Sequence, residues 1–234
     1  MGTLILVRHG QAGPGGLSAA GETQARKLAA FWIARGTCFD EVYAGTLERQ
    51  VRTQELVASS FREAGLAWPE ARSTPALNEY DAEGILTVLA PQLAARDDAF
   101  RELAAEMERA ADGTERNRRF QRMFEPLMRG WQDGALAAPD VESWRDFHER
   151  VSRALAQITN GGRPGRRVAA FTSGGPIGVA LQRALDAPER TALELNWRIR
   201  NCSLTEVVFS KNRLSLDLFN AVPHLDAPAL WTYR

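Results

Sequence analysis

An arginine and a histidine stand directly after a short apolar run near the start of the chain. The run covers residues 3–7, the pair is Arg8 and His9, and Gly10 follows. Arginine can hold a phosphate through two parallel hydrogen bonds, and a neutral imidazole nitrogen can attack phosphorus and carry the phosphoryl group. The pair therefore indicates anion chemistry, with a basic pair on the surface as the alternative.

The residues around this pair place it where ligands bind. A run rich in branched apolar residues is typical of a strand buried on both faces, and Gly10 allows a sharp turn at its end. In open α/β sheets, ligands bind beyond the carboxyl ends of the strands. Arg8 and His9 are therefore expected at the ligand-binding edge of a sheet.

Composition indicates a small, locally recognised partner. The 234 residues include 29 basic and 29 acidic ones, so no overall field favours nucleic acid or a membrane surface. Two cysteines are too few for a disulfide framework, and no apolar run is long enough for a spanning helix. No signal peptide and no histidine-carboxylate cluster with metal-ligand spacing is visible. We expect a soluble cytoplasmic protein without metal or other cofactor; the sequence does not indicate its oligomeric state.

Strands and helices alternate in the first third of the chain. Ser18 is expected to cap a helix that ends at Gly36, and residues 40–44 form the next strand. Thr46 is then expected to cap a helix reaching residue 65, with Arg49 in its first turn beside the unpaired N–H groups that attract anions. This alternation predicts a parallel sheet.

Residues 84–134 carry a helical pattern without any strand, which indicates an insertion. An apolar stripe at helical spacing indicates a buried helix face, and Pro126 within it should bend or interrupt that helix. The stripe consists of Phe120, Met123, Phe124, Leu127, Met128 and Trp131. The basic side of this segment is interpreted as a solvated face, with substrate binding as the alternative. That side consists of Arg116, Arg118, Arg119 and Arg122.

The last third of the chain returns to the alternating pattern. We expect a helix from residue 144 that Gly161 and Gly162 close, a buried strand over residues 167–172, and a hairpin over residues 203–219. The Ser173-Gly174-Gly175 turn can aim backbone N–H groups at an anion. These elements predict an α/β fold, a three-layer sandwich whose mostly parallel central sheet is flanked by helices. We expect one domain over residues 1–234, with residues 84–134 as a helical cap insertion.

Four motifs, in this order, resemble the histidine phosphatase (phosphoglycerate mutase-like) superfamily. They are Arg8-His9-Gly10, the Thr46-Leu47-Glu48-Arg49-x-x-x-Thr53 turn, Leu77-Asn78-Glu79, and Ser173-Gly174-Gly175. The resemblance implies that His9 becomes phosphohistidine while Arg8 and Arg49 hold the phosphoryl oxygens, which suits a reaction that depends on positioning and charge compensation. It also implies that Glu79 protonates the leaving group and then takes a proton from water. The alternative for Glu79 is a loop carboxylate.

One position departs from the family pattern. The family has a second histidine before the glycine pair, where this chain has Ser173, followed by Gly174. A serine offers a neutral hydrogen bond in place of a charged one, and losing such a donor costs roughly 3 to 4 kcal/mol of transition-state stabilisation. The change implies slower catalysis, use of the backbone N–H groups of the turn, or loss of catalysis. His224 or an arginine of residues 84–134 can supply the missing charge if either lies nearby.

We therefore expect a phosphomonoesterase that hydrolyses a small phosphorylated metabolite through phosphohistidine and binds inorganic phosphate. A phosphoglycerate mutase-type phosphoryl transfer is the nearer alternative, although Tyr80-Asp81-Ala82-Glu83-Gly84 departs from the basic-aromatic-glycine continuation of that branch. A phospholigand-binding protein without catalysis is the second alternative, which Ser173 motivates.

Overall fold

The computed structural model describes residues 1–111, 113–160, 163–211 and 213–233. The chain divides into two compact units, here named the core unit (residues 1–79 and 150–234) and the helical unit (residues 80–149). Across the described ranges, no helix is long and apolar enough to cross a membrane.

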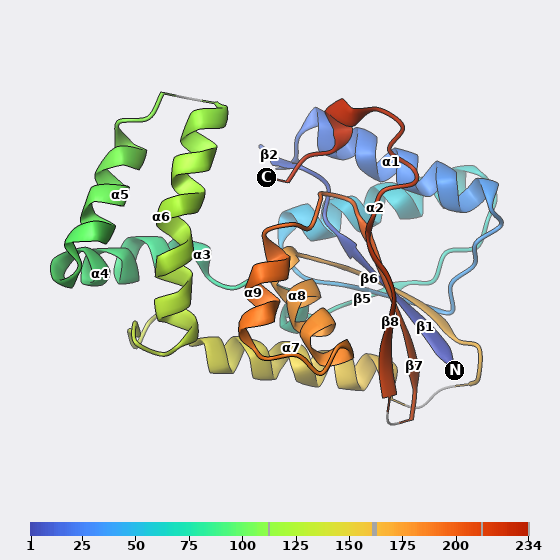
Figure 1. Ribbon diagram of the computed structural model, residues 1–234. Coiled ribbons are helices and arrows are strands. Elements are labelled where there is room, and N and C mark those ends of the chain that lie inside the picture. Colours follow the sequence, from blue (N-terminus) through green and yellow to red (C-terminus); the bar gives the residue numbers. More distant parts are fainter. Residues whose placement is uncertain (112, 161–162, 212, 234) are drawn as a thin grey trace. The chain divides into compact units, whose positions relative to one another are not determined.

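The core unit is built on a six-stranded sheet with the order β5-β4-β6-β1-β7-β8 (Figure 1). Its strands are β1 (Gly2–Arg8), β4 (Glu41–Ala44), β5 (Ala71–Ser73), β6 (Arg167–Thr172), β7 (Leu204–Ser210) and β8 (Arg213–Ala221). The first four strands in the order are parallel to one another, and β7 and β8 pair antiparallel. The expected mostly parallel sheet and the final hairpin are thereby confirmed; Asn212, in the predicted hairpin turn, lies outside the described residues.

Strand β1 lies inside this sheet, as its sequence predicts. Leu4, Leu6 and Val7 are fully buried, since β6 and β7 cover both edges of the strand and helices cover both faces. Arg8 pairs in register with Thr172 of β6, and Phe171 pairs with Ala44 of β4. The residues that follow these three strands therefore emerge side by side at one edge of the sheet.

Helices cover both faces of the sheet and make the core unit a three-layer sandwich (Figure 1). On one face, Trp32 and Phe61 pack against Val7, Val42 and Phe171. The helices are α1 (Ala19–Ala34), α2 (Glu48–Glu63), α7 (Trp144–Thr159), α8 (Gly174–Ala184) and α9 (Arg190–Asn196), with short 3-10 turns η1 (Pro75–Leu77) and η3 (Pro228–Leu230). Helix α7 begins in the helical unit and continues into the core unit; Gly161 and Gly162, expected to close it, lie outside the described residues.

The predicted helix ends are partly right. Ser18 caps α1 through a hydrogen bond from the Gly21 N–H to its hydroxyl, and Gly36 adopts the left-handed backbone conformation (φ +62°) that glycine favours after a helix. Thr46 is not the cap of α2, which begins at Glu48 after Leu47. Instead, Thr46 donates its backbone N–H to the Asn78 side chain at 2.7 Å and accepts from the same amide at 2.8 Å. A partner distant in sequence thus outcompetes the local cap.

A two-stranded ribbon, β2 (Ala12–Gly13) with β3 (Gly16–Leu17), connects β1 to α1. The sequence pattern does not indicate this ribbon, because the stretch is rich in glycine. The ribbon is closed at its base, where the Ser18 N–H donates to the Gln11 carbonyl at 2.9 Å.

The helical unit contains helices alone among its described elements. They are α3 (Ala82–Gly84), the π-helical turn η2 (Ile85–Leu89), α4 (Ala90–Arg96), α5 (Asp98–Glu108), α6 (Thr114–Gln132) and the start of α7. Pro126 does not interrupt α6, whose buried face includes Phe124, Leu127 and Trp131. The assignment of residues 84–134 as a cap insertion within a single domain stays a prediction.

The arginines of the helical unit follow the solvated-face interpretation. Arg118 and Arg119 pair with Glu115, and Arg122 pairs with Glu106. That an arginine of residues 84–134 supplies a charge to a phosphate site stays a prediction.

Candidate active site

All six residues singled out from the sequence as site residues lie in the core unit. Arg8 ends β1 and His9 follows it, Arg49 lies in the first turn of α2, and Ser173 follows β6. The backbone N–H of His9 donates to the Thr172 carbonyl at 2.9 Å, which places His9 directly beside the end of β6. Gly174 is the first residue of α8, and Glu79 ends the segment after η1.

The hydrogen bonds of His9 define its tautomer. Nδ1 lies 2.7 Å from the Gly10 carbonyl, which can only accept, so Nδ1 carries the proton. Arg49 donates its Nε–H to His9 Nε2 at 3.1 Å, so Nε2 keeps its lone pair. The imidazole therefore presents Nε2 as a nucleophilic nitrogen with a guanidinium directly beside it.

Burial and two cations keep this imidazole neutral. His9 is only 6 % exposed. Burial lowers the pKa of His9 well below its ordinary value, the charges of Arg8 and Arg49 lower it further, and the hydrogen bond to Gly10 offsets part of the effect. A neutral imidazole beside two guanidinium groups is the state required for attack on an anionic phosphate ester.

Two sets of hydrogen bonds hold His9 and its neighbours in place. Arg8 donates a guanidinium N–H to the Ile199 carbonyl. Thr53 accepts from the Gly10 N–H at 3.0 Å and donates its hydroxyl to the Arg49 carbonyl at 2.6 Å. Thr53 thereby ties the turn after His9 to the first turn of α2, which keeps Arg49 close to the imidazole.

Glu79 lies at the amino terminus of α8. The Gly175 N–H donates to both carboxylate oxygens of Glu79, at 2.9 Å and 3.2 Å. Glu79 thus lies next to the Ser173-Gly174 turn, so the structure places the predicted acid beside the predicted anion-binding turn.

Side chains hold every backbone carbonyl of the segment that leads to Glu79. Arg150 donates to the carbonyls of Pro75, Ala76 and Asn78 at 3.0 to 3.3 Å and to that of Glu79 at 3.2 Å. The Leu77 carbonyl accepts from Thr172 at 2.6 Å and from Gln50 at 3.1 Å. A segment without regular hydrogen bonding is in this way fixed at the residue that the sequence predicts to be the acid.

Sequence reasoning missed Gln50 and Arg150. Gln50 had a weak signal, since a glutamine at the third position of a helix can cap it, and its Oε1 does accept from the Leu47 N–H at 3.2 Å. Arg150 had none, because its partners lie more than 70 positions earlier in the chain.

His224 does not supply the charge that a histidine at position 173 would bring. The ring is 7 % exposed and packs against Phe31, with 6.1 Å between ring centroids. Burial lowers the pKa of His224 to about 4, so the side chain is neutral at pH 7.

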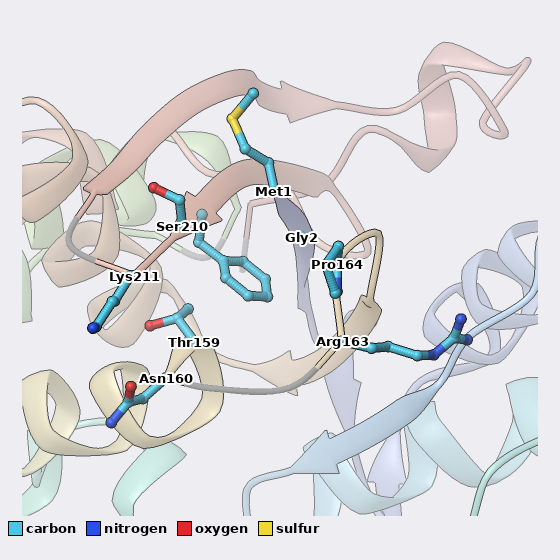
Figure 2. A pocket seen from close by; sticks show the side chains of 9 residues that line it. Met1, Gly2, Thr159, Asn160, Arg163, Pro164, Ser210 and Lys211 are labelled. Carbon is cyan, nitrogen blue, oxygen red and sulfur yellow. The ribbon is translucent and has the colours of Figure 1, made fainter.

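Two further observations concern possible metal ligands and a separate pocket. In the described part of the chain, no group of three or more His, Cys, Asp or Glu side chains gathers as metal ligands. The pocket in Figure 2 lies at the opposite end of the parallel strands, where β1 begins and β7 ends. It contains none of the predicted site residues; its lining is Met1, Gly2, Thr159, Asn160, Arg163, Pro164, Phe209, Ser210 and Lys211.

Comparison with known proteins identifies the class to which this fold and site belong. The family model of the histidine phosphatase superfamily, branch 1, matches residues 82–222, which is more than half of the chain. The chain belongs to this superfamily, as its motifs predict. The matched range contains Ser173 and Gly174, whereas Arg8, His9, Arg49 and Glu79 precede it.

Several solved structures share the fold. The alpha-ribazole phosphatase from Shigella flexneri is 18% identical with a TM-score of 0.61, over 94% of this chain and 96% of that one. The phosphoserine phosphatase from Entamoeba histolytica is 17% identical with a TM-score of 0.60, over 96% and 100%. The phosphoglycerate mutase from Bacillus anthracis is 18% identical with a TM-score of 0.62, over 95% and 94%. No curated protein matches the chain.

Proposed function

We propose that this chain is a phosphomonoesterase that hydrolyses a small phosphorylated metabolite through a phosphohistidine on His9. The observation that carries the proposal is the state of His9. Its Nδ1 is protonated against the Gly10 carbonyl, its Nε2 keeps a lone pair, and Arg49 lies 3.1 Å from that nitrogen. The fold shared with phosphatases and a mutase supports the same class of reaction.

The proposed reaction has two steps. His9 Nε2 attacks phosphorus, the ester P–O bond breaks, and Glu79 in its acid form protonates the departing alkoxide. Arg8 and Arg49 compensate the charge on the phosphoryl oxygens, and the Gly10 carbonyl stabilises the imidazolium that forms. Water then attacks phosphorus, the P–N bond breaks, and the Glu79 carboxylate takes the proton from water. Inorganic phosphate leaves and His9 returns to its neutral state.

We also propose that the protein acts in the cytoplasm without a metal or other cofactor and has small phosphorylated molecules as its partners. Ser173 favours one second candidate, a protein that binds phospholigands without turning them over. Phosphate binding without phosphate release would support that candidate.

A panel of phosphorylated metabolites together with p-nitrophenyl phosphate tests the proposal. We expect phosphate release from at least one panel member and a covalent phosphoenzyme that is labile to acid, as a phosphoramidate is. His9→Ala should lose both while the melting temperature stays within a few degrees, because His9 lies beyond the carboxyl end of β1 and is not part of the hydrophobic core. Turnover by His9→Ala would exclude the phosphohistidine.

A further inference from the structure

The hydroxyl of Ser173 is held in a buried position next to the nucleophile. Ser173 is fully buried and precedes the first residue of α8. Because Arg8 and Thr172 pair across neighbouring parallel strands, the residues that follow them, His9 and Ser173, emerge side by side. The hydroxyl therefore lies at the same sheet edge as the imidazole.

The side chain of Gln50 donates a hydrogen bond to this hydroxyl. Gln50 Oε1 accepts from the Leu47 N–H at 3.2 Å, and Nε2 donates to the Leu77 carbonyl at 3.1 Å. These two backbone partners fix which end of the amide is nitrogen. The remaining Nε2 hydrogen then points at Ser173 Oγ, 2.8 Å away. The serine oxygen is thus the acceptor in this bond.

The Ser173 hydroxyl still has its own hydrogen to donate. Since Ser173 accepts from Gln50, its own hydrogen is directed elsewhere, and among the described residues the bond from Gln50 is the hydrogen bond found at this hydroxyl. A buried donor without an acceptor is costly, and a phosphoryl oxygen beside His9 would satisfy it.

The space around the pair explains why position 173 holds a small residue. Gln50 is fully buried, and its amide lies against Gly45, where a Cβ atom would collide with Gln50 Oε1. The amide therefore occupies the volume beside Ser173. An imidazole at position 173 would overlap with this neighbourhood unless residue 50 were smaller.

We propose that Gln50 and Ser173 act as one unit, in which Gln50 positions the Ser173 hydroxyl to donate to the transferring phosphoryl group. Ser173 is then a catalytic residue and Gln50 a positioning residue. This inference rests on the proposed phosphatase function and deepens it, because it assigns to two side chains the donor role that a histidine has elsewhere in the superfamily.

A double-mutant cycle on kcat tests the pair. Ser173→Ala should lower kcat by about 10- to 100-fold, the effect of losing one hydrogen bond to a charged group, with a smaller change in KM. Gln50→Met should lower kcat by a similar factor. The double variant should be no slower than the slower single variant, because the two changes remove the same interaction. Gln54→Met, one turn further along α2, serves as the matched control and should leave kcat unchanged.

A second set of variants tests whether the Gln50 amide occupies the volume that an imidazole at position 173 would need. It also provides a replacement variant in case Gln50→Met does not fold. Ser173→His alone should lower the melting temperature, whereas Ser173→His with Gln50→Ala should regain it, together with kcat and a new ionisation near pH 6 to 7. If Gln50→Met does not fold, Gln50→Glu replaces it, since an ionised carboxylate keeps the volume and the acceptor for Leu47 but cannot donate to Ser173.

The outcomes separate this inference from the function on which it rests. Independent, multiplying effects of the two single variants would overturn it, and so would a kcat unchanged by Ser173→Ala in a protein whose turnover still requires His9. Absence of any turnover and of vanadate binding in the parent would remove the phosphatase function, and this inference with it.

Discussion

Replacing Arg49 with methionine tests both its electrostatic effect on His9 and its contact with phosphate. Arg49 donates one N–H to His9 Nε2. In the proposed reaction that bond is given up when Nε2 bonds to phosphorus. The guanidinium then lies within reach of the phosphoryl oxygens. A hydrogen bond to a charged group contributes about 1.5 to 3 kcal/mol, so Arg49→Met should weaken inhibition by vanadate roughly 10- to 150-fold.

The same variant should raise the pKa of His9. The charge of Arg49 disfavours the imidazolium, so removing it makes protonation easier, while burial and Arg8 still hold the pKa below its ordinary value. The chain has three histidines, so their Cε1–H signals can be followed in one NMR titration, and His9→Ala assigns the signal of interest.

Arg52→Met is the control, because Arg52 is on the same helix but pairs with Glu22 at 2.9 Å and is not among the charges that lower the pKa of His9. It should change neither vanadate inhibition nor the titration. A His9 pKa that stays constant or falls in Arg49→Met, with vanadate inhibition unchanged, would refute the placement of Arg49 in the anion site.

Two further predictions follow from the hydrogen bonds and burial. Arg150→Met should slow hydrolysis of an alkyl phosphate more than hydrolysis of p-nitrophenyl phosphate, and Glu79→Gln should do the same, because only a poor leaving group needs a well-placed acid. Equal losses in kcat on both substrates would show that Arg150 does not act through Glu79. The free energy of unfolding should fall as the pH drops from 7 to 4. The pKa of His224 is about 4 in the folded protein and about 6.5 in the unfolded chain, so the unfolded state binds a proton on His224 first. The difference amounts to a loss of about 3 kcal/mol. Urea unfolding of His224→Phe should show a shallower decline, and an unchanged decline would assign the effect to other groups.

Much of the fold can be predicted from short stretches of sequence, because helix capping and the spacing of apolar residues depend on nearby positions in the chain. The branched apolar run before Arg8 predicts β1, the serine at position 18 caps α1, and the stripe from Trp144 predicts α7. Each depends on neighbours within a turn or two of the chain. The same holds for the motifs: Arg8 and His9 at a strand end, and Ser173 and Gly174 at a strand-to-helix turn, indicate an anion site before any distance is known.

Tertiary structure decided what depends on partners far apart in the chain. Thr46 loses its expected capping role to Asn78, and α6, which has one buried face, continues through Pro126. Gln50 and Arg150 become part of the site only because folding brings them to Ser173 and to the segment before Glu79. A side chain with several donors can satisfy many different acceptors, so its sequence position does not specify which ones it meets. The sequence by itself thus determined the type of chemistry and the strand ends that carry it, whereas the three-dimensional packing decided which uncharged and basic side chains hold the reacting groups in place.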